Sequence, residues 1–317
     1  MEPIPSEWRA RFPETAWGDG LYESFYLKAA HPSEARAVWI RYTVHKPPDK
    51  EPTGSTWLTY FDASSSPFAR KATHRSPAAG VGDYIRIADS ALSPGRARGG
   101  AEDASWDLAF TSGEAVLRHL PRPWMYSAPV PRTKLISPAP EATFSGTLRV
   151  NGTAVDLDGW PGMLGHNWGA EHAERWIWLH AIFSPGTWID LAFGRIRLGG
   201  WTTPWVANGA LSLEGRRRRL GGLGAVRRTH VVDSVDRCDF ELPRDVTGRI
   251  ERALEQTVVW PYRDPSGSSH HSLNCSIASL KLDVGGRRLE TAHGAVYELG
   301  VRETDHGLTV LPYPDGD

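Results

Sequence analysis

The sequence predicts an all-β protein built from short antiparallel strands, and three observations support this fold class. The 317 residues include 14 Trp, 32 Gly and 24 Pro but only 3 Met, which is unlike the composition of a helix bundle. Runs rich in aromatic and β-branched residues follow one another closely, with turn residues between them. Helical periodicity is weak along almost the whole chain. This pattern is typical of β-sandwiches and barrels, and the length favours two barrel-like domains, residues 1–173 and 174–317.

Individual strands are expected where aromatic and β-branched residues cluster between turn residues. The expected strands are Tyr22–Ala29, Ala37–His45, Thr56–Phe61, Tyr84–Ala88, Trp106–Thr111, Trp176–Ala181, Trp188–Arg197, Gly209–Leu213, Thr229–Val235, Gln256–Trp260, Leu273–Val284 and Ala295–Arg302. The segment Ser93–Ala101, rich in Gly, Arg and Ala, is expected to be a loop. Four prolines between Pro121 and Pro131 indicate another irregular connection. Only Asp245–Glu255 shows helical periodicity, with Ile250 and Leu254 on one face.

Two hairpins are expected from their turn residues. Asn151-Gly152 separates two strand-like runs within Thr143–Leu157, and this dipeptide suits the positive φ angles of a type I′ turn. Gly285-Gly286 predicts a second hairpin. The run Arg216–Arg219 is expected at a solvated hairpin tip, although such a run could also contact a membrane or nucleic acid.

Composition and motifs exclude several kinds of protein. A net charge of -1 argues against nucleic-acid binding, and no apolar run is long enough to insert stably in a bilayer. The acidic, proline-containing start of the chain carries no secretory signal, so a soluble cytoplasmic protein is expected. Cys238 and Cys275 are expected to be reduced and structural. No nucleophile elbow, P-loop or dinucleotide fingerprint is present, and no cofactor is expected.

A metal site is not expected either. His166 and His172, together with Glu171, are the residues closest to such a pattern. Their spacing is neither the i, i+4 pattern of a zinc helix nor a known loop pattern.

The most informative stretch is Gly159–Ala181, which gathers four tryptophans and three histidines. At its end, Trp176, Trp178 and His180 alternate with Ile177, Leu179 and Ala181, so a strand here has two unlike faces. The second face is expected to pack in a core. The first could line a cavity for a large apolar ligand, because aromatic walls with a few polar atoms are typical of such pockets. The two tryptophans could equally fill a core.

Three side chains are candidates for acid–base chemistry. Asp190 shares a strand face with Trp188, and a carboxyl buried beside Trp would have its pKa raised and could act as a general acid. The alternative is that this face is exposed to solvent, and Glu23 is subject to the same two interpretations. His180 is either a proton donor or a histidine hydrogen-bonded to a backbone carbonyl.

These residues also carry a family resemblance. Gly165-His166-Asn167-Trp168-Gly169, followed by Arg175–His180, is similar to the K-N-W-G … W-x-W signature of tocopherol cyclases, AttH-like proteins and carotenoid 1,2-hydratases. Tyr22–Lys28 resembles the first strand of that family, and the hairpin at Asn151-Gly152 lies where the family has one. His166 stands where the cyclases have Lys, so a tocopherol-type reaction does not carry over directly.

The resemblance implies two lipocalin-like (calycin-like) antiparallel β-barrels that bind a hydrophobic isoprenoid or polyketide-like molecule. Expected activities are those of a cofactor-independent cyclase, hydratase, isomerase or pericyclase, and the alternative is a non-catalytic carrier. Indole faces would stabilise carbocation character, by about 0.5–2 kcal/mol per ring. His166, Asn167 and Trp168 are expected to support the cavity rather than react. The residues expected to contact the ligand are Trp176, Trp178, Trp168, His166, Asn167, Trp39, Tyr26 and Trp188.

Overall fold

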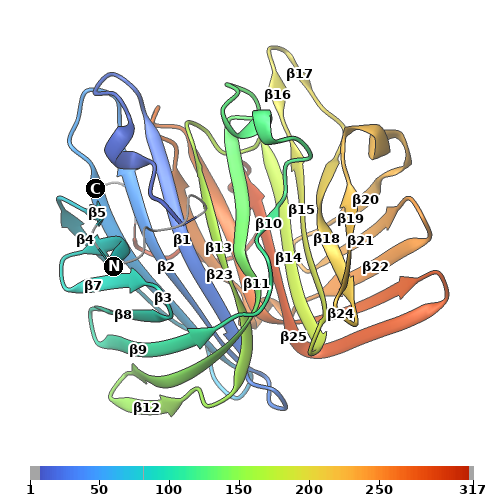
Figure 1. Ribbon diagram of the computed structural model, residues 1–317, viewed down its shortest axis with the longest axis horizontal. Helices are drawn as coiled ribbons and strands as arrows, with labels where there is room; N and C mark the ends of the chain where they lie inside the picture. The colour runs from blue at the N-terminus through green and yellow to red at the C-terminus, as the bar shows by residue number, and fades with distance from the viewer. Residues whose placement is uncertain (1–7, 81, 314–317) are drawn as a thin grey trace.

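The computed structural model describes residues 8–80 and 82–313 and is nearly all β, with 62% of residues in strands and 5% in helices. Figure 1 shows two curled antiparallel sheets side by side, with β11 and β13 of one sheet and β14 and β25 of the other near the middle. This architecture confirms the predicted all-β, two-domain lipocalin-like fold. None of the helices within the described residues is long and apolar enough to cross a membrane.

The first sheet has the strand order β4-β3-β2-β1-β13-β11-β9-β8-β7-β6-β5, and β10 and β12 both pair with β11. Neighbouring strands are antiparallel throughout this order. Its strands are β1 (Leu21–Ala30), β2 (Arg36–Lys46), β3 (Thr53–Asp62), β4 (Phe68–Arg75), β5 (Ala78–Gly80), β6 (Asp83–Ile87), β7 (Ser90–Ser93), β8 (Arg96–Ala101), β9 (Ala104–Thr111), β10 (Leu117–Arg118), β11 (Thr133–Val150), β12 (Thr153–Asp156) and β13 (Trp160–Gly169).

The second sheet has the order β19-β18-β15-β14-β25-β24-β22-β21-β20, with β23 paired to β24. Its strands are β14 (Arg175–Ser184), β15 (Thr187–Arg195), β18 (Val206–Leu213), β19 (Arg216–Gly221), β20 (His230–Asp233), β21 (Arg237–Leu242), β22 (Val246–Glu251), β23 (Val258–Arg263), β24 (Ser269–Val284) and β25 (Arg287–Val301). The change from one sheet to the other therefore falls between Gly169 and Arg175.

The remaining regular structure is short. A two-stranded ribbon joins β16 (Arg197–Leu198) to β17 (Trp201–Thr202), and four 3-10 turns are present in the described residues. These turns are η1 (Phe12–Glu14), η2 (Pro123–Tyr126), η3 (Leu223–Arg228) and η4 (Leu254–Gln256).

The two sheets pack against each other through strands buried on both faces. On β2, Val38 and Ile40 belong to the core of the first sheet, whereas Trp39 joins a core shared with the second sheet. In that shared core Trp57 of β3 lies 4.8 Å from Trp260 of β23, measured between ring centroids. Because both faces are covered, β1 and nearly all of β2 and β3 are buried. The two halves are thus joined by an aromatic interface.

Both predicted hairpins are confirmed. Asn151 and Gly152 have φ angles of 48° and 78° and join β11 to β12. Gly285 and Gly286 have φ angles of 60° and 86° and join β24 to β25. Local turn chemistry therefore sets these two registers.

The helix expected at Asp245–Glu255 is wrong, because this segment contains β22 and the short turn η4. Of the predicted pair, Ile250 is buried on β22, whereas Leu254 lies in η4 and is exposed. Ile250 shares its buried strand face with Val246, and this spacing of four fits the period of a strand as well as that of a helix. The residue between Val246 and Ile250 is Gly248, and the ring of Phe240 occupies the space that a side chain at this position would need. A Cβ at Gly248 would lie 2.2 Å from Phe240 Cζ.

Two other local predictions are also wrong. Most of the expected loop Ser93–Ala101 is β8, in which buried Ala97 and Ala101 provide the inward period-two positions of a strand. Arg216–Arg219 lies within β19 rather than at a hairpin tip, because the turn is made by Glu214 and Gly215. From β19, Arg217 pairs with Glu114 of the first half, so this basic run helps to join the two halves.

Candidate ligand cavity and histidine–aspartate cluster

A cavity of about 1030 Å³ lies between the two sheets. Its walls are largely apolar and aromatic and come from both halves of the chain. Aromatic wall residues include Tyr26 on β1, Trp39 on β2, Trp176 and Trp178 on β14, and Tyr262 on β23. The irregular segment around η2 lines another side through Met125 and several prolines. A cavity of this size and composition is typical of a site for a bulky small molecule.

Two glycines on neighbouring strands make room for the aromatic walls. Tyr26 pairs with Gly165, where an added Cβ would lie 2.1 Å from the Tyr26 ring. Trp176 pairs with Gly300, where an added Cβ would lie 2.0 Å from the indole. Each ring therefore lies flat over a cross-strand glycine, which fixes its orientation at the cavity.

The residues predicted for the site, which are ligand contacts and acid–base candidates, divide into two groups. Tyr26, Trp39, Asn167, Trp176 and Trp178 line the cavity. Glu23, His166, Trp168, His180, Trp188 and Asp190 lie outside its lining, in the packed interior around it.

Glu23, His166 and Trp168 form a buried support on one side. The Glu23 carboxylate accepts backbone N–H bonds from Arg11 at 2.8 Å and Phe12 at 2.9 Å, so it holds the segment that enters η1. His166 Nε2 lies 2.7 Å from Glu23 Oε1, and Trp168 packs beside His166 with ring centroids 4.7 Å apart. These contacts tie β1 and β13 to the N-terminal segment.

Asp190 lies at the junction of the two halves and is fully buried. It accepts hydrogen bonds from Trp178 Nε1 at 3.0 Å and Ser137 Oγ at 2.5 Å, and His119 Nε2 is 3.5 Å away. Burial alone would raise the pKa of Asp190, but the attraction of His119 and His180 and the hydrogen bonds from His119 and Ser137 bring that pKa down to about 2. The expected rise in its pKa is therefore wrong, since Asp190 is an ionised acceptor near neutral pH.

His180 and Trp188 are also enclosed. His180 Nε2 lies 2.8 Å from the carbonyl oxygen of Pro140, and burial lowers the pKa of His180 to about 4. The backbone-bonded alternative for His180 is thus the arrangement present. Trp188 lies under the guanidinium of Arg217, 5.0 Å from the ring centroid.

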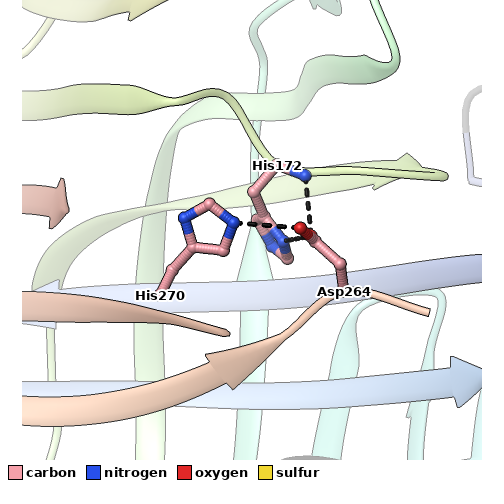
Figure 2. Close-up of side chains that lie close together, drawn as sticks. All are labelled: His172, Asp264 and His270. Carbon is pink, nitrogen blue, oxygen red and sulfur yellow. Dashed lines mark hydrogen bonds and ion pairs between the residues drawn. The ribbon is translucent and has the colours of Figure 1, made fainter. Parts of the chain in front are cut away.

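A second histidine–aspartate cluster reaches the cavity and was not expected from the sequence. Figure 2 shows His172, Asp264 and His270 close together. His172 Nδ1 lies 2.6 Å from Asp264 Oδ1, and His270 Nε2 lies 2.9 Å from Asp264 Oδ2. The backbone N–H of His172 also donates to Oδ1, at 2.8 Å. His172 lines the cavity, whereas Asp264 and His270 are completely buried behind it.

The environment of this cluster sets its protonation. Burial would raise the pKa of Asp264, but hydrogen bonds from His172 and His270 hold that pKa well below its usual range. Burial lowers the pKa of His172, and the hydrogen bond to Asp264 only partly offsets this effect. His172 is therefore a neutral imidazole near pH 7. With Nδ1 bound to Asp264, Nε2 is the ring atom left to meet a ligand.

The same three side chains could also hold a metal ion, because their possible ligand atoms all lie within 4.8 Å of one another. In the arrangement present, both carboxylate oxygens instead lie at hydrogen-bond distance from imidazole nitrogens. The carboxylate of Asp264 is thus paired with both imidazoles, whereas His270 Nδ1 is buried without a hydrogen-bond partner. The metal set considered from the sequence is different, because His172 is joined here by neither His166 nor Glu171.

No known family profile matches the chain. Two uncharacterized proteins of Mycobacterium tuberculosis, MT0513 of strain CDC 1551 / Oshkosh and Rv0493c of strain H37Rv, are each 26% identical over 313 residues, covering 93% of this chain and 91% of theirs. The crystal structure of a "putative AttH (NE1406)" from Nitrosomonas europaea matches with a TM-score of 0.60 and 13% identity, covering 95% of this chain and 99% of that one. This chain has an AttH-like fold. The comparison confirms the resemblance at the level of fold.

Proposed function

We propose that this protein is a cofactor-independent enzyme that binds a bulky hydrophobic small molecule between its two sheets and rearranges it by proton transfer. The reaction class is that of an isomerase, cyclase or hydratase. The aromatic walls hold the ligand in a reactive conformation, which lowers the entropic part of the barrier. One observation carries the proposal: a neutral histidine with an ionised partner, His172 with Asp264, lines a large aromatic cavity.

In this mechanism His172 accepts a proton from the bound molecule at Nε2. The imidazolium that forms is stabilised by Asp264, whose carboxylate already holds Nδ1 at 2.6 Å. His270 holds the second carboxylate oxygen at 2.9 Å and fixes its direction. Returning the proton to a different carbon isomerises the ligand, and returning it after a new carbon–carbon bond has formed within the deprotonated ligand gives a cyclised isomer. In hydration, His172 instead takes the proton from a water molecule whose oxygen adds to a double bond of the ligand, and then returns that proton to the neighbouring carbon.

The stacking around His172 supports this role. Its ring lies 3.8 Å from the ring of Tyr22 and 5.4 Å from that of Trp176, both in stacked geometry. The imidazole plane is thus fixed by two stacked rings as well as by Asp264. A fixed general base needs little reorganisation when it takes up a proton.

The test uses whatever hydrophobic molecule remains bound to the purified protein, identified by native mass spectrometry. The wild-type protein in D₂O should incorporate deuterium into that molecule, and His172→Gln should bind it normally but slow incorporation by about 10²–10⁴-fold. His271→Gln is the matched control, since His271 is the neighbour of His270 on β24 but pairs with His306, away from the cavity. Unchanged incorporation in His172→Gln, or a stoichiometric metal ion bound at the cluster, would contradict the proposal.

The alternative is a non-catalytic carrier for the same kind of ligand. The full burial of Asp190 and His180 favours a carrier, because neither of these two candidate acids lines the cavity. A carrier would bind the molecule without any deuterium incorporation in the wild-type protein.

A further inference from the structure

Arg41 is a buried cation beside the ligand cavity. It lies on β2, is 6% exposed and lines the cavity. Its Nε donates to Ser24 Oγ at 3.0 Å, and its guanidinium lies 5.1 Å from the ring of Trp39, 4.9 Å from that of Trp57 and 4.5 Å from that of Tyr262. Nη1 is enclosed and has no hydrogen-bond partner. No carboxylate of the described residues forms an ion pair with Arg41.

Two other buried cations, Arg252 and Lys46, each have three backbone carbonyl partners. Arg252 donates to the carbonyl oxygens of Val235, Leu273 and Tyr297 at 2.6–3.1 Å. Lys46 donates to three carbonyl oxygens near η1 at 2.7–3.0 Å. The partners of Arg41 are instead the faces of three aromatic rings and the hydroxyl of Ser24. A buried charge with so few polar partners is costly unless an anion joins it.

The acidic residues around the cavity are already engaged. Glu171 pairs with Arg132 and Arg302, and Glu174 pairs with Arg302. Glu298 accepts hydrogen bonds from Trp176 Nε1 at 2.9 Å and Asn274 Nδ2 at 3.3 Å. None of these carboxylates pairs with Arg41, so the positive charge is left for something that enters the cavity.

We infer that the ligand is an amphipathic carboxylic acid whose carboxylate binds Arg41 while its apolar body lies against the aromatic walls. The inference rests on the proposed ligand cavity and adds the chemical class of its occupant. A guanidinium that forms no ion pair with a carboxylate matches a single negative charge, and its planar N–H groups match the two oxygens of a carboxylate. Tyr262 lies directly against the guanidinium and also lines the cavity, so the anion would enter beside this ring.

Three probes with one apolar skeleton test the inference: all-trans-retinoic acid, its methyl ester and retinol. Binding is followed by quenching of Trp fluorescence, because Trp39, Trp176 and Trp178 line the cavity. The wild-type protein should bind the acid about tenfold more tightly than the ester or the alcohol, as expected for a hydrogen bond between charged groups. In Arg41→Met this preference should fall to less than about twofold.

Lys71→Met is the matched control, since Lys71 Nζ lies 4.2 Å from the ring of Trp57 but does not line the cavity. That variant should keep the preference for the acid. Equal affinities for acid and ester in the wild-type protein would overturn the inference without any variant, while leaving the apolar cavity in place. A preference that persists in Arg41→Met would also overturn it. If none of the three probes binds, both the inference and the proposed cavity function fail.

Discussion

Two histidine–aspartate clusters lie within the part of the chain that the structure describes, and they differ in what their histidines can still bind. In the cavity cluster, His172 has Nδ1 on Asp264 and keeps Nε2 for a ligand. In the junction cluster, Asp190 accepts hydrogen bonds from Ser137 on β11 and from Trp178 on β14. These two strands belong to different sheets. His119 beside it has both ring nitrogens occupied, with Nδ1 3.1 Å from the carbonyl oxygen of Asn208 and Nε2 3.2 Å from Ser137 Oγ.

The comparison shows that burial and a shifted pKa do not by themselves mark a catalytic group. Both aspartates are enclosed and ionised, and both have histidine neighbours. Only the cavity cluster presents a ring nitrogen without a protein partner at the surface of a cavity. The junction cluster uses its charge to join the two halves of the chain.

The largest effect is expected for Asp190→Ala. This change leaves the Ser137 hydroxyl, the Trp178 indole N–H and His119 without their shared acceptor, which should lower the free energy of unfolding by about 3–5 kcal/mol. Urea unfolding followed by Trp fluorescence measures the loss. If Asp190→Ala keeps the wild-type stability and ligand binding but loses turnover, Asp190 belongs to the chemistry and the comparison is wrong.

A smaller effect is expected from the acid titration of His180. Folding lowers the pKa of His180 to about 4, so between about pH 6.5 and pH 4 the unfolded chain binds a proton that the native protein does not. Stability should fall in this window, by up to about 3 kcal/mol for this group. The contribution of Asp190, whose pKa is about 2, should be lost only as the pH falls below about 4.

Thermal unfolding between pH 7 and pH 4 tests the assignment to His180. His180→Gln can still donate to the Pro140 carbonyl oxygen but cannot take up the proton, so its stability should fall less steeply in this range. A variant with the same pH profile as the wild-type protein would show that another group, such as His172, is responsible.

The fold could be predicted because its signals are local. Alternation along Trp176–Ala181 and the turns at Asn151-Gly152 and Gly285-Gly286 are visible within a few residues. At Asp245–Glu255 local information failed, because a spacing of four suits both a helix and a strand. Gly248 favours the strand, but the reason for a glycine there is the ring of Phe240 on the neighbouring strand, which the local sequence does not reveal.

The cavity cluster could not be predicted in the same way. His172 and Asp264 are separated by 92 residues and meet only when β23 and β24 pack beside the start of β14. The aromatic walls at Trp176 and Trp178 were visible as a strand face. Asp190 was visible too, but its ionised state depends on Ser137 and His119, which come from the other half of the chain.

Filling the cavity between the sheets and measuring the binding of retinoic acid tests whether the ligand binds there. Ala192 on β15 lines the cavity next to Trp178, so Ala192→Phe should occupy part of the ligand space. Ala109→Phe is the control, because Ala109 is exposed on β9 and lies outside the cavity. We expect Ala192→Phe to fold but to bind retinoic acid at least about tenfold more weakly, while Ala109→Phe binds it as the wild-type protein does. Equal binding by all three proteins would place the ligand elsewhere and contradict a ligand site between the sheets.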